Sequence, residues 1–412
     1  MGTNKKVCLV RVSSVCSRRT MDYLDVVRYA KANGFTVLPK DQIAEAEFGC
    51  LVTCGSTDSS NANSLSELDY LRTYIPEEKI VVLGCLSATL DGFKESFKGK
   101  FVAPIDYQKD FDNAFIDIGV MDALRTPYNE FDHSTEDFFE HIPYFSSEHW
   151  FLLTSMGCRG VCKYCRIKSA IGNLNSFSPE SIVKSLLRGI AKGYRLFWPS
   201  GDDLGAYGLD IGETFPALLG KLIAVGESLG VSIQIDCRTV IDPRYLIKYE
   251  EELLKTLTLK RGNIISLGVG LQSPISRLLQ LSNRYHEVDR IESVIAKIKE
   301  ESGGLFMPAH LIVGFPTETI EETKRSFDFI ERSPIDLWVC NRYSHLRGTR
   351  FYGEYKKLPN VPEENYNVFK ELVYDSPFYY HELSPNGPLY ILKNPNPRFF
   401  TPMLERGSPV IK

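Results

Sequence analysis

The amino-acid sequence predicts an α/β protein built on two parallel sheets. Strand and helix signals alternate along the first hundred residues, and the alternation resumes from Trp150 in six further strand–helix units. Strands separated by helices favour parallel sheets with helices packed on their faces. We therefore expect an N-terminal doubly wound parallel sheet, followed by a curved sheet or partial barrel of six strand–helix units.

The N-terminal hundred residues carry the pattern of an open sheet. Apolar runs predict strands at residues 7–12, 35–38, 48–53 and 80–84, with helices at 21–32 and 64–73. No glycine-rich phosphate-binding turn follows the first strand, so the sequence does not support a dinucleotide site. Residues 106–148 hold eleven acidic and two basic residues, which indicates a solvated acidic connector with a helix at 112–124.

The second run of units begins with a strand at 150–155. Ser178 and Pro179 have the residue types of a helix cap and first turn, and further helices are expected at 289–301 and 319–331. The remaining five strands are expected at 195–199, 231–236, 264–272, 308–315 and 337–343. We divide the chain into an N-terminal domain (1–105), the acidic connector (106–148), a core domain (149–352) and a C-terminal extension (353–412).

The C-terminal extension is rich in proline. Seven prolines fall within the 36 residues from Pro377 onward. Because proline lacks the backbone N–H that helices and inner strands need, we expect extended segments and turns there, without long helices or central strands.

Composition limits the classes of function. The chain has 412 residues, 43% hydrophobic residues and a net charge of −4, which excludes a strongly basic nucleic-acid coat. No apolar run reaches the length of a membrane span and no signal peptide is apparent, so we expect a cytoplasmic protein without membrane contact. Ten cysteines in such a chain point to metal ligands or reactive thiols rather than disulfides. Burial as small apolar side chains accounts for four of them: Cys8, Cys50, Cys237 and Cys340.

Three further cysteines lie close together in the sequence. Cys158, Cys162 and Cys165 have a C-x₃-C-x₂-C spacing in the loop after the first strand of the core domain. Structural zinc normally takes four protein ligands, and an ordinary iron–sulfur cluster takes four thiolates. Three thiolates leave one iron open to a substrate or cofactor. The alternative is a zinc site with a fourth ligand elsewhere in the chain.

This spacing, the aromatic Tyr164 and the six following units resemble the radical S-adenosylmethionine (radical SAM) superfamily. The resemblance implies a [4Fe–4S] cluster on Cys158, Cys162 and Cys165. It also implies that the open iron binds the amino and carboxylate groups of SAM, and that the reduced cluster cleaves SAM to a 5′-deoxyadenosyl radical.

A second set of cysteines is spread over the N-terminal domain. Cys16, Cys54 and Cys85 each follow a predicted strand, and the strand ends of a doubly wound sheet gather along one edge. The spacing alone leaves two interpretations open, a convergent site and buried structural cysteines.

The surroundings of these cysteines resemble the methylthiotransferases, which are radical SAM enzymes with a second [4Fe–4S] cluster held by three N-terminal cysteines. The matching stretches are Val15-Cys16 with Asp22, Val52-Thr53-Cys54, Leu83-Gly84-Cys85, 201–208, 271–273, 283–285, 312–319, 343–344 and 347–349. The chain departs from the family pattern at Val15, Arg19, Val52 and Thr317, the last standing where glycine is frequent. Residues 377–412 are too short for the complete TRAM domain with which family members usually end.

The same resemblance implies contacts to SAM at the strand ends of the core domain. The residues concerned are Gly201, Asp202, Asp203, Gln272, Ser273, Arg284, Gly314, Glu318 and Tyr343. Alternatives are open for three of them, since Asp203 has the residue type of a helix cap, Glu318 that of a first-turn helix acid and Arg284 that of a loop cap. At Gly314, the missing side chain is expected to admit a flat ring.

The resemblance predicts conversion of C–H to C–SCH₃ on a tRNA, a protein or peptide, or another substrate. The predicted cofactors are two [4Fe–4S] clusters and SAM, with an external electron donor such as flavodoxin or ferredoxin and a monomeric chain. Sulfur insertion without methylation would need the same six cysteines. A non-catalytic iron–sulfur sensor is the alternative from another class.

Overall fold

The computed structural model describes residues 6–11, 17–38, 40–116, 148–358, 361–382 and 387–394. They fall into two compact units. We call residues 1–133 with 165–173 and 346–349 the N-terminal unit, and residues 134–164, 174–345 and 350–412 the barrel unit. Cys16, most of the acidic connector and the last eighteen residues lie outside the described residues. The domain boundaries given above stay predictions.

The N-terminal unit is an open sheet of five strands in the order β2-β1-β3-β4-β5, and every neighbouring pair is parallel. This order matches a doubly wound sheet with its switch point between β1 and β3, which confirms the predicted fold class. Two of the three inner strands, β3 and β4, are buried along their whole length, as expected where helices cover both faces. The strands are β1 (Lys6–Arg11), β2 (Thr36–Leu38), β3 (Phe48–Thr53), β4 (Ile80–Gly84) and β5 (Lys100–Val102).

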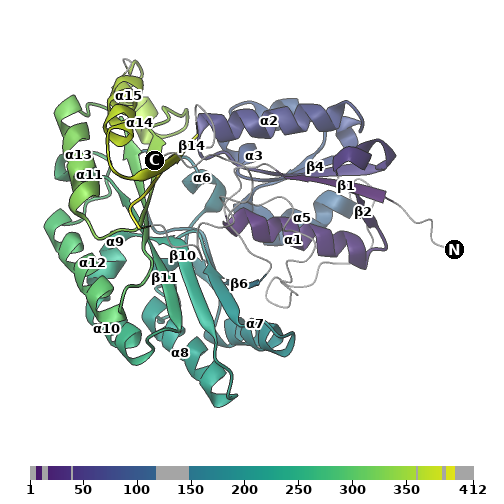
Figure 1. The fold of residues 1–412 in the computed structure, drawn as a ribbon. Coiled ribbons are helices and arrows are strands. Elements are labelled where there is room, and N and C mark those ends of the chain that lie inside the picture. The colour runs from purple at the N-terminus through teal and green to yellow at the C-terminus, as the bar shows by residue number, and fades with distance from the viewer. Residues whose placement is uncertain are drawn as a thin grey trace. The chain divides into compact units, whose positions relative to one another are not determined.

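Helices cover the two faces of this sheet, with α2 on one and α1 and α5 on the other (Figure 1). Three helices begin earlier than the apolar pattern predicts. The clearest case is α2, which starts at Asp58 because the Thr57 hydroxyl caps it by accepting from the Ser60 N–H at 3.1 Å. The helices are α1 (Ser17–Ala32), α2 (Asp58–Arg72), α3 (Leu86–Thr89), α4 (Phe93–Ser96), α5 (Tyr107–Ile116) and α6 (Lys168–Ile171), with short 3₁₀ turns η1 (Lys40–Glu45), η2 (Glu77–Lys79) and η3 (Pro104–Asp106).

The barrel unit contains a sheet of eight strands in the order β14-β15-β13-β12-β11-β10-β9-β6. Its six parallel strands follow the chain order, which confirms the predicted partial barrel. A two-stranded ribbon stands beside it, made of β7 (Ser155–Met156) and β8 (Asn175–Ser176). The parallel strands are β6 (His149–Leu153), β9 (Leu196–Ser200), β10 (Gln234–Ile241), β11 (Ile264–Gln272), β12 (Pro308–Val313) and β13 (Leu337–Arg342).

Helices line the outer face of the curved sheet (Figure 1). Ser178 and Pro179 open α7 as expected, because the Ser178 hydroxyl accepts from the Ser181 N–H at 3.3 Å. None of the helices among the described residues is long and apolar enough to cross a membrane. The helices are α7 (Pro179–Ala191), α8 (Phe215–Ser228), α9 (Pro243–Lys248), α10 (Glu250–Leu259), α11 (Ser276–Leu281), α12 (Val288–Ser302), α13 (Ile320–Arg332), α14 (Arg350–Glu354) and α15 (Val361–Tyr374), with the 3₁₀ turn η5 (Leu204–Ala206).

The C-terminal extension joins the barrel sheet as an antiparallel hairpin of β14 (Tyr379–Glu382) and β15 (Leu389–Leu392). The expectation of no central strand after Pro377 is wrong, because β15 pairs with β13 on one side and β14 on the other. The prolines do not prevent this pairing. Pro388 precedes β15 and Pro395 follows it, so all four strand residues keep their N–H groups.

Truncation of Ile391 tests whether this hairpin is part of the barrel core. Ile391 is fully buried and pairs with Trp338. We expect Ile391→Val to lower the free energy of unfolding by about 0.5–1.5 kcal/mol and Ile391→Ala by about 2–5 kcal/mol. Urea unfolding followed by tryptophan fluorescence reports on this unit, since all three tryptophans lie on its strands. Unchanged midpoints in both variants would show that the hairpin is an appendage.

Candidate functional site

The first cysteine set lies in the loop after β6 and β7, and Gly157 anchors its start by donating its N–H to Asp202 Oδ2 at 2.7 Å. Cys158 Sγ accepts from the Gly160 N–H at 3.1 Å. A Cβ atom at Gly160 would lie 3.2 Å from Cys158 Sγ and 3.7 Å from Cys162 Sγ. Two sulfurs therefore flank the same position, which the glycine leaves empty.

The segment after α11 holds this loop in place. The Lys163 N–H donates to Ser282 O at 2.9 Å, and Asn283 Nδ2 donates to Val161 O at 3.3 Å. Asn283 has a φ of +55°, a left-handed conformation that asparagine tolerates better than most residues. Arg284 Nη1 then reaches Cys162 Sγ at 3.4 Å. The structure thus brings together Cys162 and Arg284, both of which the sequence singles out.

Arg284 is a buried cation whose charge is balanced by its protein neighbours. Its guanidinium donates to Gly270 O at 2.8 Å and pairs with Asp242 Oδ2 at 3.0 Å. Burial opposes the charge, but Tyr164, Asp242 and Cys162 raise the pKa of Arg284 well above its ordinary value. A buried positive charge therefore lies within hydrogen-bond distance of the Cys162 sulfur.

Asp242 is a site residue that the sequence pattern did not single out. This residue follows β10 directly and caps α9, since Oδ1 accepts from the Arg244 N–H at 3.0 Å. Arg244 also binds its two oxygens through the side chain, at 3.0 and 2.8 Å. Burial works against the charge, yet Arg284 and Arg244 lower the pKa of Asp242. The available signal was an Asp-Pro cap after a strand end, at the same edge as the residues 201–203.

Asp203 lies beside the cysteine loop with an unused acceptor. Cys158 Sγ is 3.8 Å from its Oδ2, whereas its buried Oδ1 has no hydrogen-bond partner within the described part of the chain. Burial and the nearby Asp242 raise the pKa of Asp203 to about 6. Its side chain does not cap η5, so the helix-cap interpretation is not what the structure shows. The buried hydroxyls of Ser155 and Ser200 lack partners among these residues too, and such groups suit a polar ligand.

Gln272 and Ser273 end β11 at the same edge of the sheet. Gln272 has a φ of +66°, which costs roughly 1–3 kcal/mol in a non-glycine residue and is concentrated at functional sites. Ser273 Oγ accepts from the Ile275 N–H at 3.1 Å, so this hydroxyl is engaged locally. The structure gives Gln272 the geometry of a site residue and Ser273 that of a turn residue.

Gly314 follows β12 with a φ of +85°. A Cβ atom there would lie 2.4 Å from Pro362 Cα, so the space expected for a flat ring is taken by the start of α15. Glu318 fixes this turn, because its Oε2 accepts from the Gly314 N–H at 2.7 Å and the Phe315 N–H at 2.8 Å. Its Oε1 accepts from Thr323 Oγ1 at 2.9 Å. In this geometry the Glu318 side chain holds the turn by binding the backbone N–H groups of the turn.

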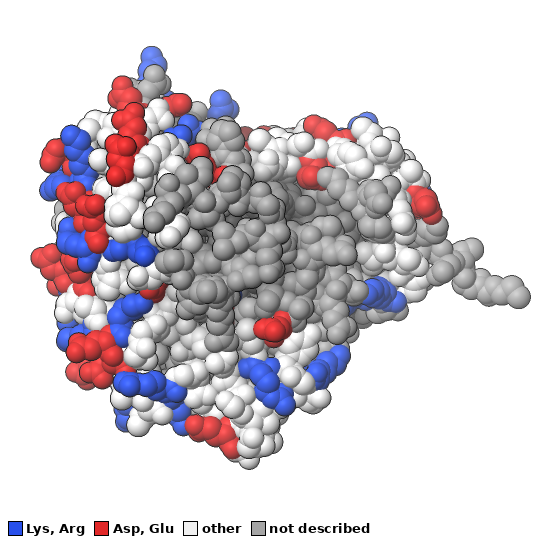
Figure 2. Space-filling view, in the orientation of Figure 1, with Lys and Arg blue, Asp and Glu red and all other residues white. Residues whose placement is uncertain are grey.

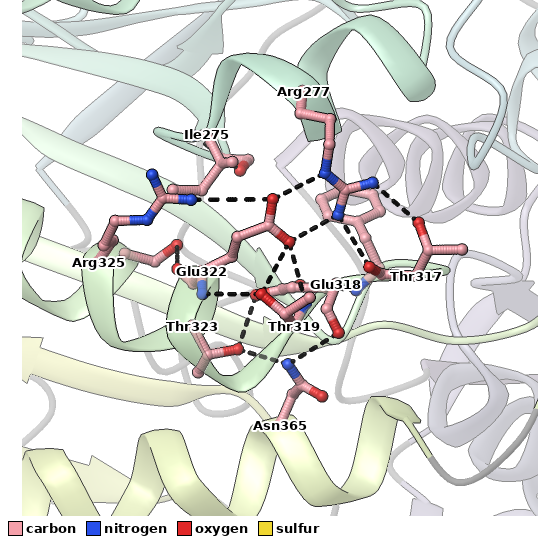
Figure 3. Close-up of polar contacts among 12 residues, drawn as sticks. Ile275, Arg277, Thr317, Glu318, Thr319, Glu322, Thr323, Arg325 and Asn365 are labelled. Atoms are coloured by element: carbon pink, nitrogen blue, oxygen red, sulfur yellow. Dashed lines mark hydrogen bonds and ion pairs between the residues drawn. The ribbon is translucent and has the colours of Figure 1, made fainter.

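A second carboxylate supports the same turn (Figure 3). Thr317 has a φ of +64°, an unfavourable conformation for a β-branched residue. Arg277 stabilises it by donating to Thr317 Oγ1 at 3.0 Å and Thr317 O at 2.8 Å. Arg277 also binds both oxygens of Glu322, at 2.8 and 2.6 Å, and Glu322 forms a capping box with Thr319. The cluster explains how threonine occupies a position that suits glycine.

Tyr343 belongs to an aromatic cluster around Phe315. The two rings are 5.7 Å apart, and Tyr164 from the cysteine loop packs on Phe315 at 5.5 Å. The Tyr343 hydroxyl lies 3.3 Å from His345 Nδ1. The aromatic residue before the last cysteine of the loop therefore has a packing role at the end of β12.

In the N-terminal unit, Cys54 and Cys85 follow strand residues that are paired in register, Thr53 and Gly84. Thr53 joins the two loops. Its hydroxyl donates to Leu83 O at 2.7 Å and accepts from the Leu86 N–H at 3.2 Å, while its carbonyl accepts from the Cys85 N–H at 3.3 Å. Both cysteines are buried. The structure brings these two members of the second set to neighbouring strand ends.

The Cys54 loop is fixed by its own hydroxyl neighbours. Ser64 Oγ donates to Cys54 O at 2.9 Å and accepts from its N–H at 3.2 Å. Ser56 Oγ lies 3.1 Å from Cys54 Sγ. Cys16 lies outside the described residues, but it follows β1, which is the other neighbour of β3. Among the described residues, Cys54 and Cys85 thus follow adjacent strands of the sheet.

The cysteine thiols of these loops are of the donor type that holds iron–sulfur clusters. Within the described ranges, no three His, Cys, Asp or Glu side chains are gathered as they would be around a metal ion. Thiols on two short, backbone-fixed loops are the donor type that iron–sulfur clusters use, and the position next to Gly160 is bordered by two of them.

Residues 152–330 match the family model of the radical SAM superfamily. A probable threonylcarbamoyladenosine tRNA methylthiotransferase of Archaeoglobus fulgidus is 27% identical over 74% of this chain and 70% of its own length. The ribosomal protein uS12 methylthiotransferase RimO of Thermodesulfovibrio yellowstonii is 24% identical over 85% of this chain and 79% of its own. The chain spans only 48% of a similar protein from Pyrococcus horikoshii, at 29% identity.

Among solved structures, the radical SAM methyltransferase TsrM of Kitasatospora setae has the same fold. The TM-score is 0.60 at 14% sequence identity, and the match covers 97% of this chain and 88% of TsrM.

Substitution of Gly84 tests how closely the β3 and β4 loops depend on each other. A Cβ atom at Gly84 would lie 2.3 Å from Thr53 O, and the φ is +99°. At Gly92 the φ is +74°, but nothing lies within 4 Å. We expect Gly84→Ala to accelerate amide hydrogen exchange in peptides spanning 48–56 and 80–89. Gly92→Ala should leave these peptides protected, because it adds only the cost of the left-handed backbone, roughly 1–2 kcal/mol. Equal exchange in the two variants would contradict this reading.

Glu318 makes the stability of the barrel unit depend on pH. Burial raises its pKa from 4.5 to about 7, so the folded chain holds this proton more tightly than the unfolded chain. Stability is therefore highest below the unfolded pKa and falls as the pH rises through about 7, by on the order of 3 kcal/mol.

Thermal unfolding of Glu318→Gln between pH 5 and 8 checks this expectation, since the amide stays neutral and should flatten the decline. Glu322→Gln is the matched control. Its hydrogen bond to Arg277 lowers the pKa of Glu322, so this variant should keep the decline. A wild-type profile that rises from pH 5 to 7 would refute the role given to Glu318.

Proposed function

This chain carries a radical SAM domain and is a relative of the methylthiotransferases, and we propose that it is a radical SAM methylthiotransferase that converts C–H to C–SCH₃. The observation that supports this proposal best is the position of the described cysteines. Cys158 and Cys162 lie in the loop after β7, and Cys54 and Cys85 follow adjacent parallel strands of the N-terminal sheet. One set would serve radical formation and the other sulfur transfer.

The cofactors of a radical SAM domain are SAM and a [4Fe–4S] cluster, and we assign the cluster ligands to Cys158, Cys162 and Cys165. When bound, they supply the 5′-deoxyadenosyl radical that abstracts hydrogen from the substrate. Arg284 donates a hydrogen bond to the Cys162 sulfur, and Asp202 holds the start of the loop. The unused Oδ1 of Asp203 is suited to accept a hydrogen bond from the SAM ammonium group.

We assign Cys16, Cys54 and Cys85 to the second cluster. Thr53 and Ser64 fix the backbone of the two described loops through hydrogen bonds. Sulfur insertion without methylation would use the same six cysteines, and the mass of the product separates the two reactions.

For the substrate, we propose a tRNA or a ribosomal protein residue, as the names of the relatives suggest. On the face in Figure 2, Lys and Arg alternate with Asp and Glu over α10, α12 and α13. The ion pair Arg332–Glu292, for example, joins α13 to α12 and balances one charge with the other. We therefore expect at most a shallow salt dependence for RNA binding by this face. We further propose a monomer in the cytoplasm that takes electrons from a flavodoxin or ferredoxin.

Iron content tests the two-cluster assignment. We expect about eight irons per chain after anaerobic reconstitution and about four once Cys158, Cys162 and Cys165 are all changed to Ala. That variant should no longer form 5′-deoxyadenosine from SAM. Replacing Cys16, Cys54 and Cys85 with Ala should leave SAM cleavage but abolish sulfur transfer. A wild-type chain with about four irons would contradict the assignment.

Mass spectrometry identifies the substrate and the reaction together. Cellular tRNA and protein are compared with and without this chain. The expected product gains the mass of SCH₃ in place of hydrogen, whereas a gain of SH in its place would favour sulfur insertion alone.

A further inference from the structure

The sulfur of Cys54 lies next to a hydroxyl group. Ser56 Oγ is 3.1 Å from Cys54 Sγ, and this contact is separate from the hydrogen bonds through which Ser64 fixes the loop backbone. Cys54 is buried, whereas Ser56 is exposed to solvent. Contacts of exposed side chains add little to the stability of a fold, so this contact points to a role at the sulfur itself.

Three hydroxyl groups form a chain that ends at this sulfur. Ser60 Oγ lies 2.9 Å from Thr57 Oγ1 and 3.5 Å from Ser56 Oγ. Thr57 Oγ1 accepts from the Ser60 N–H at 3.1 Å, which caps α2 and leaves the hydrogen of the Thr57 hydroxyl available. Ser60 can therefore accept from Thr57 and donate to Ser56, which directs the hydrogen of Ser56 toward Cys54.

The charge state of the sulfur decides the direction of this chain. A thiol at Cys54 can donate to Ser56 or accept from it. A thiolate that binds iron has no hydrogen, so Ser56 must then be the donor. Hydrogen bonds that run in one direction along a chain strengthen one another. The structure thus holds a hydroxyl donor beside a proposed cluster ligand.

We propose that Ser56 is a positioning residue that donates a hydrogen bond to the Cys54 thiolate and thereby raises the reduction potential of the second cluster. This inference rests on the proposed function, because that function assigns Cys54 to the cluster. A hydrogen bond to a ligand sulfur withdraws electron density from the iron, which stabilises the reduced state. The sulfurs of the first set accept from other groups, the Gly160 N–H and the Arg284 guanidinium, so a change at Ser56 leaves those bonds in place.

The test is a potentiometric titration with dithionite, followed by EPR, of the reconstituted full-length chain without SAM. Cys158, Cys162 and Cys165 are changed to Ala in this background chain, so that only the second cluster is expected. We expect Ser56→Val to lower the equilibrium constant for one-electron reduction about tenfold, which lowers the midpoint potential by about 59 mV. Ser56→Thr keeps the hydroxyl in a side chain of the same shape as valine and should keep the potential of the background chain.

Two further variants show whether the hydroxyl chain is responsible. Ser66→Ala is the matched control, because Ser66 is exposed on the same helix, α2, and has no hydrogen-bond partner within the described part of the chain. It should leave the potential unchanged. Ser60→Ala keeps the contact of Ser56 with the sulfur but shortens the chain, so it should lower the potential by less than Ser56→Val does. All variants should hold about four irons.

The outcomes separate this inference from the function on which it rests. A background chain that holds no cluster overturns both. A cluster whose potential is the same with Ser56→Val as in the background chain overturns the inference alone. Equal shifts in Ser56→Val and Ser56→Thr also overturn it, because the size of the side chain and not its hydroxyl would then set the potential.

Discussion

Strand direction is the constraint on which the rest of this molecule depends. Every neighbouring pair in the N-terminal sheet, and every pair among the first six barrel strands, is parallel. Parallel strands bring all their carboxyl ends to one edge, so residues far apart in the sequence become neighbours without any contact designed between them. Cys54 beside Cys85 and Asp203 beside Asp242 both follow from that one rule.

Backbone groups, more than side chains, hold these edges rigid. Thr53 joins the two cysteine loops of the N-terminal sheet through two carbonyls and two N–H groups. Glu318 does the same for the turn after β12, and Asp202 for the start of the cysteine loop. A site assembled in this way is preorganised by its own backbone, which is the condition for precise positioning of a bound group.

The fold was predictable from the sequence because apolar runs and cap residues are local signals. The strands β3, β4 and β11 have the predicted bounds, and Ser178 caps the predicted helix. Helix α2 starts six residues early because a single hydroxyl, Thr57, outweighs a polar first turn. β15 was missed because proline content was averaged over a long stretch, although no proline lies within the strand.

The candidate site was less predictable, because side-chain direction depends on tertiary partners. The family resemblance singled out Arg284 and Asp203, but only the fold shows that Arg284 is paired with Asp242 while Asp203 keeps an acceptor atom without a partner among the described residues. Asp242 itself was missed, since a cap residue next to proline has the same local pattern whether or not a buried arginine lies behind it.

Thr317 shows how the contacts of one turn limit which residues can be exchanged in this chain. Its left-handed backbone is tolerated because Arg277 binds both its hydroxyl and its carbonyl, and the same guanidinium holds Glu322. The two positions are therefore energetically coupled. With Arg277 present, threonine is acceptable at 317, and once Arg277 is lost, glycine becomes the favoured residue. The cost of losing Arg277 therefore depends on whether residue 317 is threonine or glycine, and an engineered change at either position has an effect that depends on the residue at the other.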